Sequence, residues 1–429
     1  MIELKKLFNK NLIKSYSGEV TWVILGYLIV VLGNIFLVKI LTENLDPIDY
    51  GRLALSFTLS ILATQVAFSI CASGIKRYYI LSVEQGYAYA FSIASKQLFL
   101  TGVFVAIFIE IIILGVLFHF NKIQLLLPTF IAIIFQILLV ASSLMNAVQN
   151  AQRNRKIVAV HEGMLILLRV IFSIIIFTVL NKSNLLFLLI GYVVAVGIVN
   201  TSQLVFIKSL FKKEKDTKVD VLKWKLKIWK YSKPAMYYNL FTWIQMSSDR
   251  WAIETFMSTA EVGLFSTVLQ LGWAPINIMT TIGLNFVTPI FFKKSGNVKN
   301  KENNNKVNNA TWAIIKVTWI VISIIFIITY FYHSNIYKYL VSEEYRSISF
   351  LLPWMILAGG FFSTSQVLIL KIQSDLRPNQ LVMPKIMIAL LGLSFNFIGV
   401  YYFGLKGIVG GIVSSSALSF IWLSLLKKV

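Results

Sequence analysis

The sequence predicts an all-α polytopic membrane protein with twelve transmembrane helices, arranged as two pseudo-symmetric six-helix lobes around a central cavity. Of its 429 residues, 57% are hydrophobic and 14% are charged, and the mean hydropathy is +0.75. Soluble domains have about 25% charged residues. Apolar runs of about 20 residues recur along the chain, which is the length that a helix needs to cross a bilayer core of about 30 Å.

Twelve apolar runs have this length. They lie near residues 20–41, 53–74, 97–118, 124–147, 158–180, 184–207, 234–257, 264–292, 311–331, 347–370, 384–403 and 407–426. The first run is longer than the apolar part of a signal peptide and lacks a small-residue cleavage site, so we expect it to be the first span. Cys71 is the only cysteine, which excludes an intrachain disulfide.

Lysine and arginine are distributed unevenly between the two sides of the membrane. Most of the 40 Lys and Arg lie in segments on the side that also holds both termini, and the net charge is +22. The outer loops hold only Arg52, Lys122, Lys182, Lys338, Arg346 and Lys406. The positive-inside rule therefore predicts cytoplasmic N- and C-termini, and it explains the basic charge without a nucleic-acid partner. Frequent Ile, Lys and Asn indicate an AT-rich bacterial gene, and hence the bacterial inner membrane.

Two basic segments are amphipathic. Residues 1–19 and the central segment that contains Leu222, Leu226 and Trp229 carry apolar residues on one helix face and lysines on the other. This pattern suits helices that lie in the headgroup region and attract anionic lipid. Solvated lysine-rich loops are the alternative.

Short matches indicate an internal repeat. The letters KSYS at residues 14–17 resemble KYS at 230–232, and DYGRL at 49–53 resembles EVGLF at 261–265. We therefore expect an N-terminal lobe over residues 1–207, a linker over 208–233 and a C-terminal lobe over 234–429. Repeats of this kind place transporter sites at the interface between the halves.

The span at 234–257 contains Asp249 and Arg250. Either charge at the centre of a bilayer costs about 2.5–3.5 kcal/mol, so such residues face a bundle interior or a wet cavity. Neighbouring residues on a helix do not face each other, so these two cannot fully neutralise one another. Tyr238, Thr242, Gln245 and Asp249 follow the i, i+4, i+7, i+11 pattern, which predicts a polar stripe along a cavity.

Other polar residues recur inside the predicted spans. Arg169 lies about 17 Å along its span at 1.5 Å per residue, near the midplane, and Lys39 lies close to the outer end of the first span. Gln65, Ser69 and Ser73 lead at i+4 spacing to Arg77 at the inner mouth. A further stripe comprises Asn277, Thr281 and Asn285, between Pro275 and Pro289. Glu110 and Asp249 are candidates for binding a coupling proton or sodium ion.

Each candidate has a structural alternative. Lys39 could snorkel to the outer interface, and Arg77 could be an ordinary positive-inside residue. Arg169 could pair with Glu110, and Arg250 with Asp249 or Glu254. Stripes of small polar residues also serve as hydrogen bonds between helices.

Taken together, the lysine-rich start, the Tyr50-Gly51 pair after the first span, the six-plus-six layout, Asp249-Arg250 and the EVG triplet at 261–263 resemble the MOP superfamily. The resemblance is to its flippases for O-antigen or capsule units. It implies alternating access and a polyprenyl-pyrophosphate-linked sugar unit as the substrate, moved from the cytoplasmic to the outer leaflet. It also implies polymerase and chain-length proteins as partners.

Three other functions can be compared with this one. A multidrug and toxin extruder of the same superfamily would favour an acidic pocket, whereas Lys39, Arg169 and Arg250 outnumber Glu110 and Asp249. A membrane-bound sugar polymerase or ligase would need a substantial outer loop, and the sequence has no metal-ligand cluster, phosphate loop or nucleophile elbow, so neither an enzyme nor a cofactor is predicted. A passive scaffold has little reason to retain charges at depth.

Overall fold

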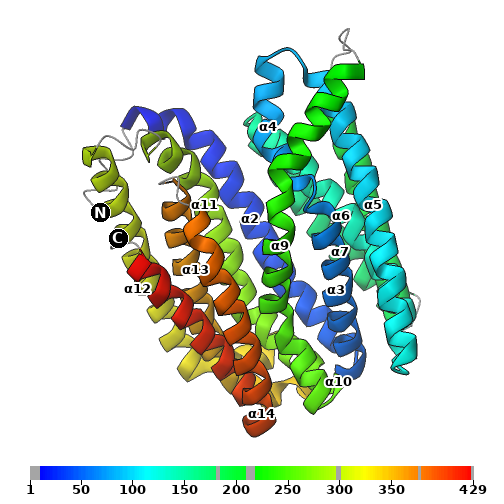
Figure 1. Ribbon diagram of the computed structural model, residues 1–429. Helices are drawn as coiled ribbons and strands as arrows, with labels where there is room; N and C mark the ends of the chain where they lie inside the picture. Colours follow the sequence, from blue (N-terminus) through cyan, green and yellow to red (C-terminus); the bar gives the residue numbers. More distant parts are fainter. Residues whose placement is uncertain (1–9, 180–183, 209–217, 296–300, 375–377, 427–429) are drawn as a thin grey trace. The chain divides into compact units, whose positions relative to one another are not determined.

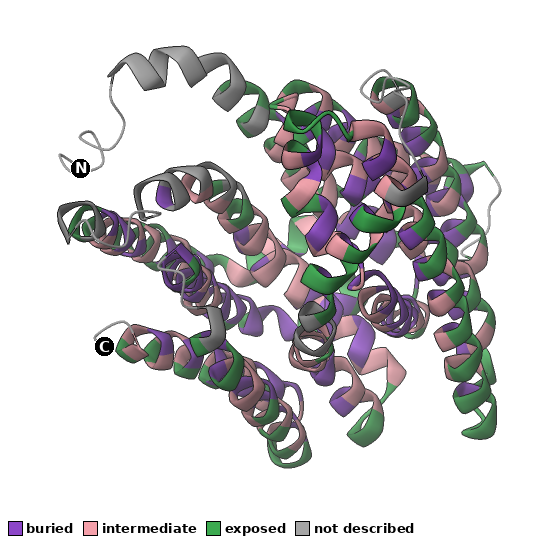
Figure 2. Ribbon diagram, turned by 45° about the horizontal axis from the view of Figure 1, so that its top comes forward, coloured by how far each residue is buried: buried purple, intermediate pink, exposed green. Residues whose placement is uncertain are grey.

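A computed structural model describes residues 10–179, 184–208, 218–295, 301–374 and 378–426. All the regular elements in these ranges are helical, and ten helical stretches are long and apolar enough to cross a membrane (Figure 1). Exposed residues run along the full length of the long helices (Figure 2), and many are large hydrophobics, such as Phe104 at 73% and Phe331 at 73%. An apolar surface of this kind suits contact with lipid. The prediction of an all-α polytopic membrane protein is confirmed.

The helices follow one another with short connections. They are α2 (Lys10–Asn44), α3 (Pro47–Phe68), α4 (Ala72–Glu84), α5 (Ala88–His119), η1 (Ile123–Leu125), α6 (Leu126–Ala151), α7 (Arg155–Thr178), α8 (Leu185–Lys208), α9 (Lys218–Phe256), α10 (Thr259–Val268), η2 (Leu269–Trp273), α11 (Ala274–Ser295), α12 (Lys301–Leu340), η3 (Glu343–Leu351), α13 (Leu352–Ser374), η4 (Pro378–Leu381) and α14 (Val382–Leu426).

Two helices, α9 and α14, explain why ten apolar stretches are found where twelve spans were predicted. α14 holds both of the last two predicted spans, and its only non-helical residue is Gly404, with φ 56° and ψ −139°. This conformation is essentially restricted to glycine, and it falls between the predicted spans at 384–403 and 407–426. α9 contains the seventh predicted span, but its polar residues keep it out of the ten.

The chain forms two compact units. Unit 2 comprises residues 49–243, and unit 1 comprises residues 1–48 together with 244–429. The end of α2 belongs to unit 1 because the Tyr345 hydroxyl donates a hydrogen bond to the Leu45 carbonyl oxygen at 2.9 Å, and the Ser342 N–H donates to Thr42 Oγ1 at 3.4 Å. The lobes at 1–207 and 234–429, their pseudo-symmetry and the central cavity stay predictions.

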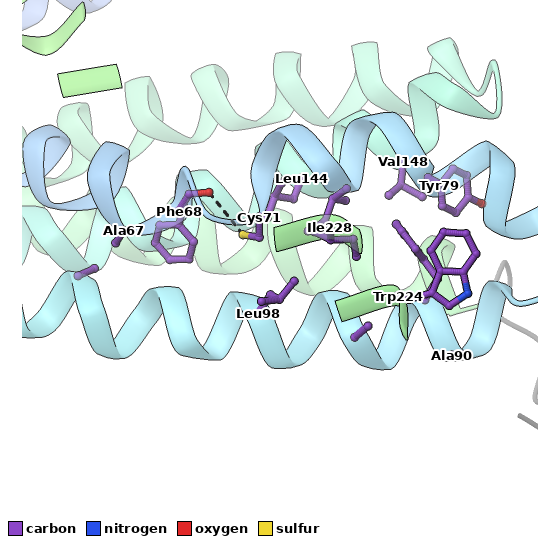
Figure 3. Close-up of a cluster of buried hydrophobic side chains, with 14 of the residues drawn as sticks. Ala67, Phe68, Cys71, Tyr79, Ala90, Leu98, Leu144, Val148, Trp224 and Ile228 are labelled. Carbon is purple, nitrogen blue, oxygen red and sulfur yellow. Dashed lines mark hydrogen bonds between the residues drawn. The ribbon is translucent and has the colours of Figure 1, made fainter. Parts of the chain in front are cut away.

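The first part of α9 packs into the core of unit 2. Trp224 and Ile228 are 4% and 0% exposed, and they lie among side chains of α3, α4, α5 and α6 (Figure 3). The Gly74 N–H of α4 donates to Ser232 Oγ at 2.7 Å. The predicted linker is therefore the beginning of α9 from residue 218 onward, while residues 209–217 lie outside the described ranges.

The amphipathic pattern of this segment has two apolar faces. Trp224 and Ile228 face the core, whereas Leu222, Leu226 and Trp229 are 57%, 56% and 42% exposed. The exposed face also carries the exposed residues Lys223, Lys230 and Lys233. Predicted contact with anionic lipid is compatible with this surface and stays a prediction. Residues 1–9 of the amphipathic start lie outside the described ranges, and the side chains of residues 10–19 are not described.

The second predicted span, 53–74, has the wrong boundaries. α3 begins at Pro47, ends at Phe68 and is followed by a turn before α4 begins at Ala72. Proline suits the first turn of a helix because its missing N–H has no intrahelical partner there. The apolar run continues through the turn, so hydropathy alone does not reveal the end of α3.

A π-helical turn lies just before Pro275. This turn, η2, comes between α10 and α11, and the Ala274 N–H bonds to the Leu269 carbonyl five residues earlier. Proline removes one backbone donor and its ring crowds the preceding turn, which widens the helix locally. Beside η2, a side chain at Gly272 would lie 2.9 Å from Met355 Cβ, so the bulged segment packs closely against α13.

Replacing Gly74 with alanine is expected to destabilise the protein by about 1–3 kcal/mol, which is typical of overpacking. The new Cβ would lie 2.6 Å from the Ile228 carbonyl oxygen and 2.8 Å from Ser232 Oγ, forcing α4 away from α9. The melting temperature of the detergent-purified protein measures the effect. Gly197→Ala is the matched control because its Cβ meets nothing within 4 Å. Equal melting temperatures for the two variants would contradict the packing of α4 against α9.

Candidate functional site

Arg169 of α7 lies against aromatic rings of two neighbouring helices. Its guanidinium carbon is 4.4 Å from the centroid of the Tyr192 ring on α8 and 5.6 Å from that of Phe135 on α6. Both rings are buried, and their centroids are 5.8 Å apart. Such cation–π contacts contribute about 0.5–2 kcal/mol each. The rings hold the half-buried arginine in place without cancelling its charge.

The alternative partner of Arg169 does not contact it. Glu110 of α5 is 2% exposed and neither carboxylate oxygen has a hydrogen-bond partner; Arg169 Nε is also unpartnered. Both residues are in the described part of the chain, and no salt bridge joins them. Arg169 thus has no hydrogen-bond partner at Nε, and Glu110 is a carboxyl group without a hydrogen-bond partner in an apolar helix. A carboxyl group in such a place is a candidate for proton binding.

A buried polar network in unit 2 was missed by the sequence reasoning. Asn146 of α6 donates to Glu162 of α7 at 3.3 Å and accepts from Gln203 of α8, whose side-chain oxygen accepts from Ser142 at 3.1 Å. Nearby on α6, Gln149 is 1% exposed and its amide atoms have no partner. The sequence does contain a pattern that indicates this network, because Ser142, Asn146 and Gln149 follow the i, i+4, i+7 spacing of a polar helix face.

In unit 1, the second part of α9 carries its own buried polar cluster. Asp249 is 4% exposed and its Oδ1 accepts the backbone N–H of Arg250 at 2.7 Å. One residue earlier, Ser248 Oγ accepts from Asn396 Nδ2 of α14 at 2.9 Å. The side chains of Arg250 and Asp249 are both described and form no salt bridge, because adjacent residues on a helix point in different directions.

The other predicted cations lie nearer the surface. Lys39 Nζ is 3.9 Å from Glu43 Oε1, and both side chains are substantially exposed, at 41% and 50%. A pair of this kind on one helix contributes a few tenths of a kcal/mol, about 0.2–0.5. Arg77 is exposed on α4. Their predicted role in binding a headgroup remains a prediction.

One predicted polar stripe is not continuous. Gln65 lies on α3, Ser69 in the turn after it, and Ser73 and Arg77 on α4, so the i+4 spacing does not run down a single helix. The correction follows from the turn at residues 69–71. Gln65 Oε1 is nevertheless buried without a partner, whereas the Ser69 hydroxyl donates to the Val66 carbonyl at 2.6 Å.

The stripes of α9 and α11 lie on continuous helices. Thr242 and Gln245 are half-buried on α9, while the side chain of Tyr238 lies outside the described residues. On α11 the exposed Thr281 hydroxyl donates to the Asn277 carbonyl at 2.9 Å, and the side chain of Asn285 is not described. The neighbouring Thr280 instead bonds to Ser363 of α13, as the interhelical alternative predicts for such residues.

No protein-family model and no curated protein matches the chain. Solved structures do match over nearly its whole length. An inward-facing multidrug resistance MATE family transporter of the MOP superfamily has a TM-score of 0.61 and 16% identity, with 94% of this chain and 96% of that chain covered. A mutant of a Vibrio cholerae MATE transporter gives 0.64 and 14%, with 97% of each chain covered. The chain has the MATE transporter fold.

The MATE fold has been captured in more than one state. An outward-facing multidrug resistance MATE family transporter matches this chain with a TM-score of 0.61 and 15% identity, covering 96% of this chain and 97% of that chain. The fold implied by the resemblance to the MOP superfamily therefore agrees with these structures. At 14–16% identity the likeness extends to the fold alone.

Proposed function

We propose that the protein flips polyprenyl-pyrophosphate-linked oligosaccharide units from the cytoplasmic to the outer leaflet of the bacterial inner membrane, by alternating access. A single observation carries the proposal: the side chains of Arg169 and Arg250, both within predicted spans, form no salt bridge in the described part of the chain. The MATE fold supports a carrier mechanism, since it is shared with transporters solved in inward- and outward-facing states.

Unpaired arginines favour an anionic cargo. Placing an arginine side chain at the centre of a bilayer costs about 2.5–3.5 kcal/mol. We therefore expect these two side chains to bind a ligand. The planar guanidinium group donates two parallel hydrogen bonds to a phosphate, which lysine cannot do. A pyrophosphate head with its neutral sugars is the kind of cargo that such groups bind.

A multidrug exporter is the second candidate. The matching structures are described as multidrug resistance transporters, and the carboxyl groups of Glu110, Glu162 and Asp249 would suit cationic substrates. Glu162, Lys316 and Lys385 also fall inside predicted spans. The balance of cations over carboxylates therefore does not by itself decide between an anionic and a cationic cargo. The anionic cargo is favoured because Arg169 and Arg250 form no salt bridge in the described part of the chain.

Other parts of the proposal follow from a flippase role. Glu110 and Asp249 would bind the coupling proton or sodium ion, and polysaccharide polymerase and chain-length proteins would receive the flipped unit. The termini would lie in the cytoplasm. Lys39 and Arg77 would contact the headgroup at the two mouths of the path.

A deletion strain tests the function directly. Loss of the protein is expected to trap lipid-linked oligosaccharide in the cytoplasmic leaflet and to remove surface polysaccharide, both of which the plasmid-borne gene restores. In a drug-sensitive host, the same plasmid should leave the inhibitory concentration of ethidium unchanged. Normal surface polysaccharide in the deletion strain, together with ethidium resistance from the plasmid, would favour the exporter instead.

Replacing Arg250 with alanine is expected to reduce surface polysaccharide about tenfold, because a hydrogen bond to a charged group contributes about 1.5–3 kcal/mol. Arg250→Lys should recover part of the loss, since lysine keeps the positive charge but cannot donate two parallel hydrogen bonds to a phosphate. Membrane abundance on an immunoblot should stay near normal. Arg346→Ala is the matched control: Arg346 lies in an outer loop of the predicted topology, and its Nη2 donates to the Lys338 carbonyl at 3.3 Å in an exposed hydrogen bond. Wild-type polysaccharide levels with Arg250→Ala would remove this residue from the site.

A further inference from the structure

The two halves of α14 form a tightly packed hairpin. The chain reverses at Gly404, and the halves meet where Gly399 and Gly407 approach each other so closely that a Cβ on either would lie within 2.5 Å of the other's carbonyl oxygen. Small residues allow helix backbones to approach in this way in membranes. The same absence of side chains leaves a depression along the hairpin.

This depression is an open groove of about 390 Å³. Its walls include Phe395, Ile398 and Phe403, and glycines, among them Gly410, form its floor. Gly410 is exposed and a Cβ there would meet nothing within 4 Å, so no protein atom fills the space above it. The volume falls in the range of ligand pockets, about 300–1,000 Å³.

The end of the groove near the turn is basic and aromatic. Lys406, two residues beyond Gly404, lines this end, is exposed, and has its Nζ 5.4 Å from the centroid of the Phe350 ring. Tyr401, Tyr402 and Phe403 beside it are 65%, 68% and 71% exposed. Exposed tyrosines and a lysine at the end of a span are typical of the boundary between acyl chains and headgroups. The groove thus runs from this boundary into the acyl region, over about 12 Å from Lys406 to Ser414 at 1.5 Å per residue.

We infer that this groove binds the isoprenoid chain of a polyprenyl phosphate, with the phosphate beside Lys406. The apolar walls of the groove suit a hydrocarbon chain, and polyprenyl lipids have one such chain where phospholipids have two. Lys406 supplies charge complementarity to a phosphate at the boundary. The inference rests on the proposed function: it gives the tail of the flipped lipid a site on the surface of unit 1.

Photo-cross-linking tests the groove independently of transport. The probe is a polyprenyl monophosphate with a diazirine on its terminal isoprene, added to the full-length protein in phosphatidylcholine nanodiscs. Peptide mapping is expected to find the adduct within residues 395–414. Gly410→Leu, whose Cβ would meet nothing within 4 Å, should occupy the groove and reduce the adduct at least tenfold. Lys406→Gln should reduce it about threefold.

The control for groove filling is Gly115→Leu on α5, another exposed glycine whose Cβ would meet nothing within 4 Å. It should leave the α14 adduct unchanged. Equal labelling with Gly410→Leu, or an adduct spread evenly over other lipid-facing helices, would overturn the inference. So would full competition by excess phosphatidylglycerol, which would indicate a general site for anionic lipids. Since the probe carries no sugar, these outcomes are independent of whether Arg250→Ala blocks polysaccharide export.

Discussion

Replacing Arg169 with alanine is expected to lower the rate of oligosaccharide-lipid flipping about 10- to 100-fold. A hydrogen bond to a charged group contributes about 1.5–3 kcal/mol, and each 1.4 kcal/mol is a factor of ten. Arg169 has this potential because it is held by Tyr192 and Phe135 and not by Glu110. The measurement is the fraction of lipid-linked oligosaccharide that reaches the periplasmic leaflet. This leaflet faces outward in right-side-out vesicles and inward in inverted vesicles.

Two substitutions of Tyr192 serve as controls for the prediction about Arg169. Tyr192→Phe keeps the ring under the guanidinium group and should flip at nearly the wild-type rate. Tyr192→Leu removes it and should reduce the rate about two- to thirtyfold, because a cation–π contact contributes about 0.5–2 kcal/mol. If Arg169→Ala, inserted at normal abundance, flips substrate at the wild-type rate, Arg169 does not bind the cargo. If Tyr192→Phe and Tyr192→Leu lose activity equally, the ring does not position Arg169.

The sequence allowed the helical fold to be predicted because hydropathy depends on composition along a single run of residues. Most span boundaries agree with the helices within a few residues, such as 158–180 with α7 and 184–207 with α8. The turn after Phe68 escaped detection because its residues are as apolar as those of the flanking helices. The continuity of α9 escaped because its first turns are charged on one side and buried on the other, and only packing against α4 reveals the buried side.

The candidate site was predictable only one residue at a time. A charge within an apolar run is visible in the sequence, so Arg169 and Arg250 could be named. Their surroundings could not, because Phe135 and Tyr192 are 34 and 23 residues from Arg169 along the chain and are brought to it by helix packing. Similarly, the hydrogen bond that Asn146 donates to Glu162 connects α6 and α7, which no local periodicity places side by side.

Replacing Gly407 with alanine is expected to have the largest effect on folding. The added Cβ would lie 1.8 Å from the Gly399 carbonyl oxygen, which is a backbone atom that cannot rotate away. The two halves of α14 would have to separate, at the upper end of or beyond the 1–3 kcal/mol that overpacking usually costs. Fluorescence-detected size exclusion should show little monodisperse protein, and any remaining protein should have a lowered melting temperature.

Gly410→Ala, three residues along the same helix, provides the matched comparison. Its Cβ would meet nothing within 4 Å, and alanine is favoured over glycine in a helix by about 1 kcal/mol, so this variant should be as stable as the wild type or more so. Opposite effects of one chemical change at two positions on one helix can arise only if the halves of α14 meet at Gly407. Wild-type yield and melting temperature for Gly407→Ala would mean that the halves lie further apart, and the groove between them would lose its floor.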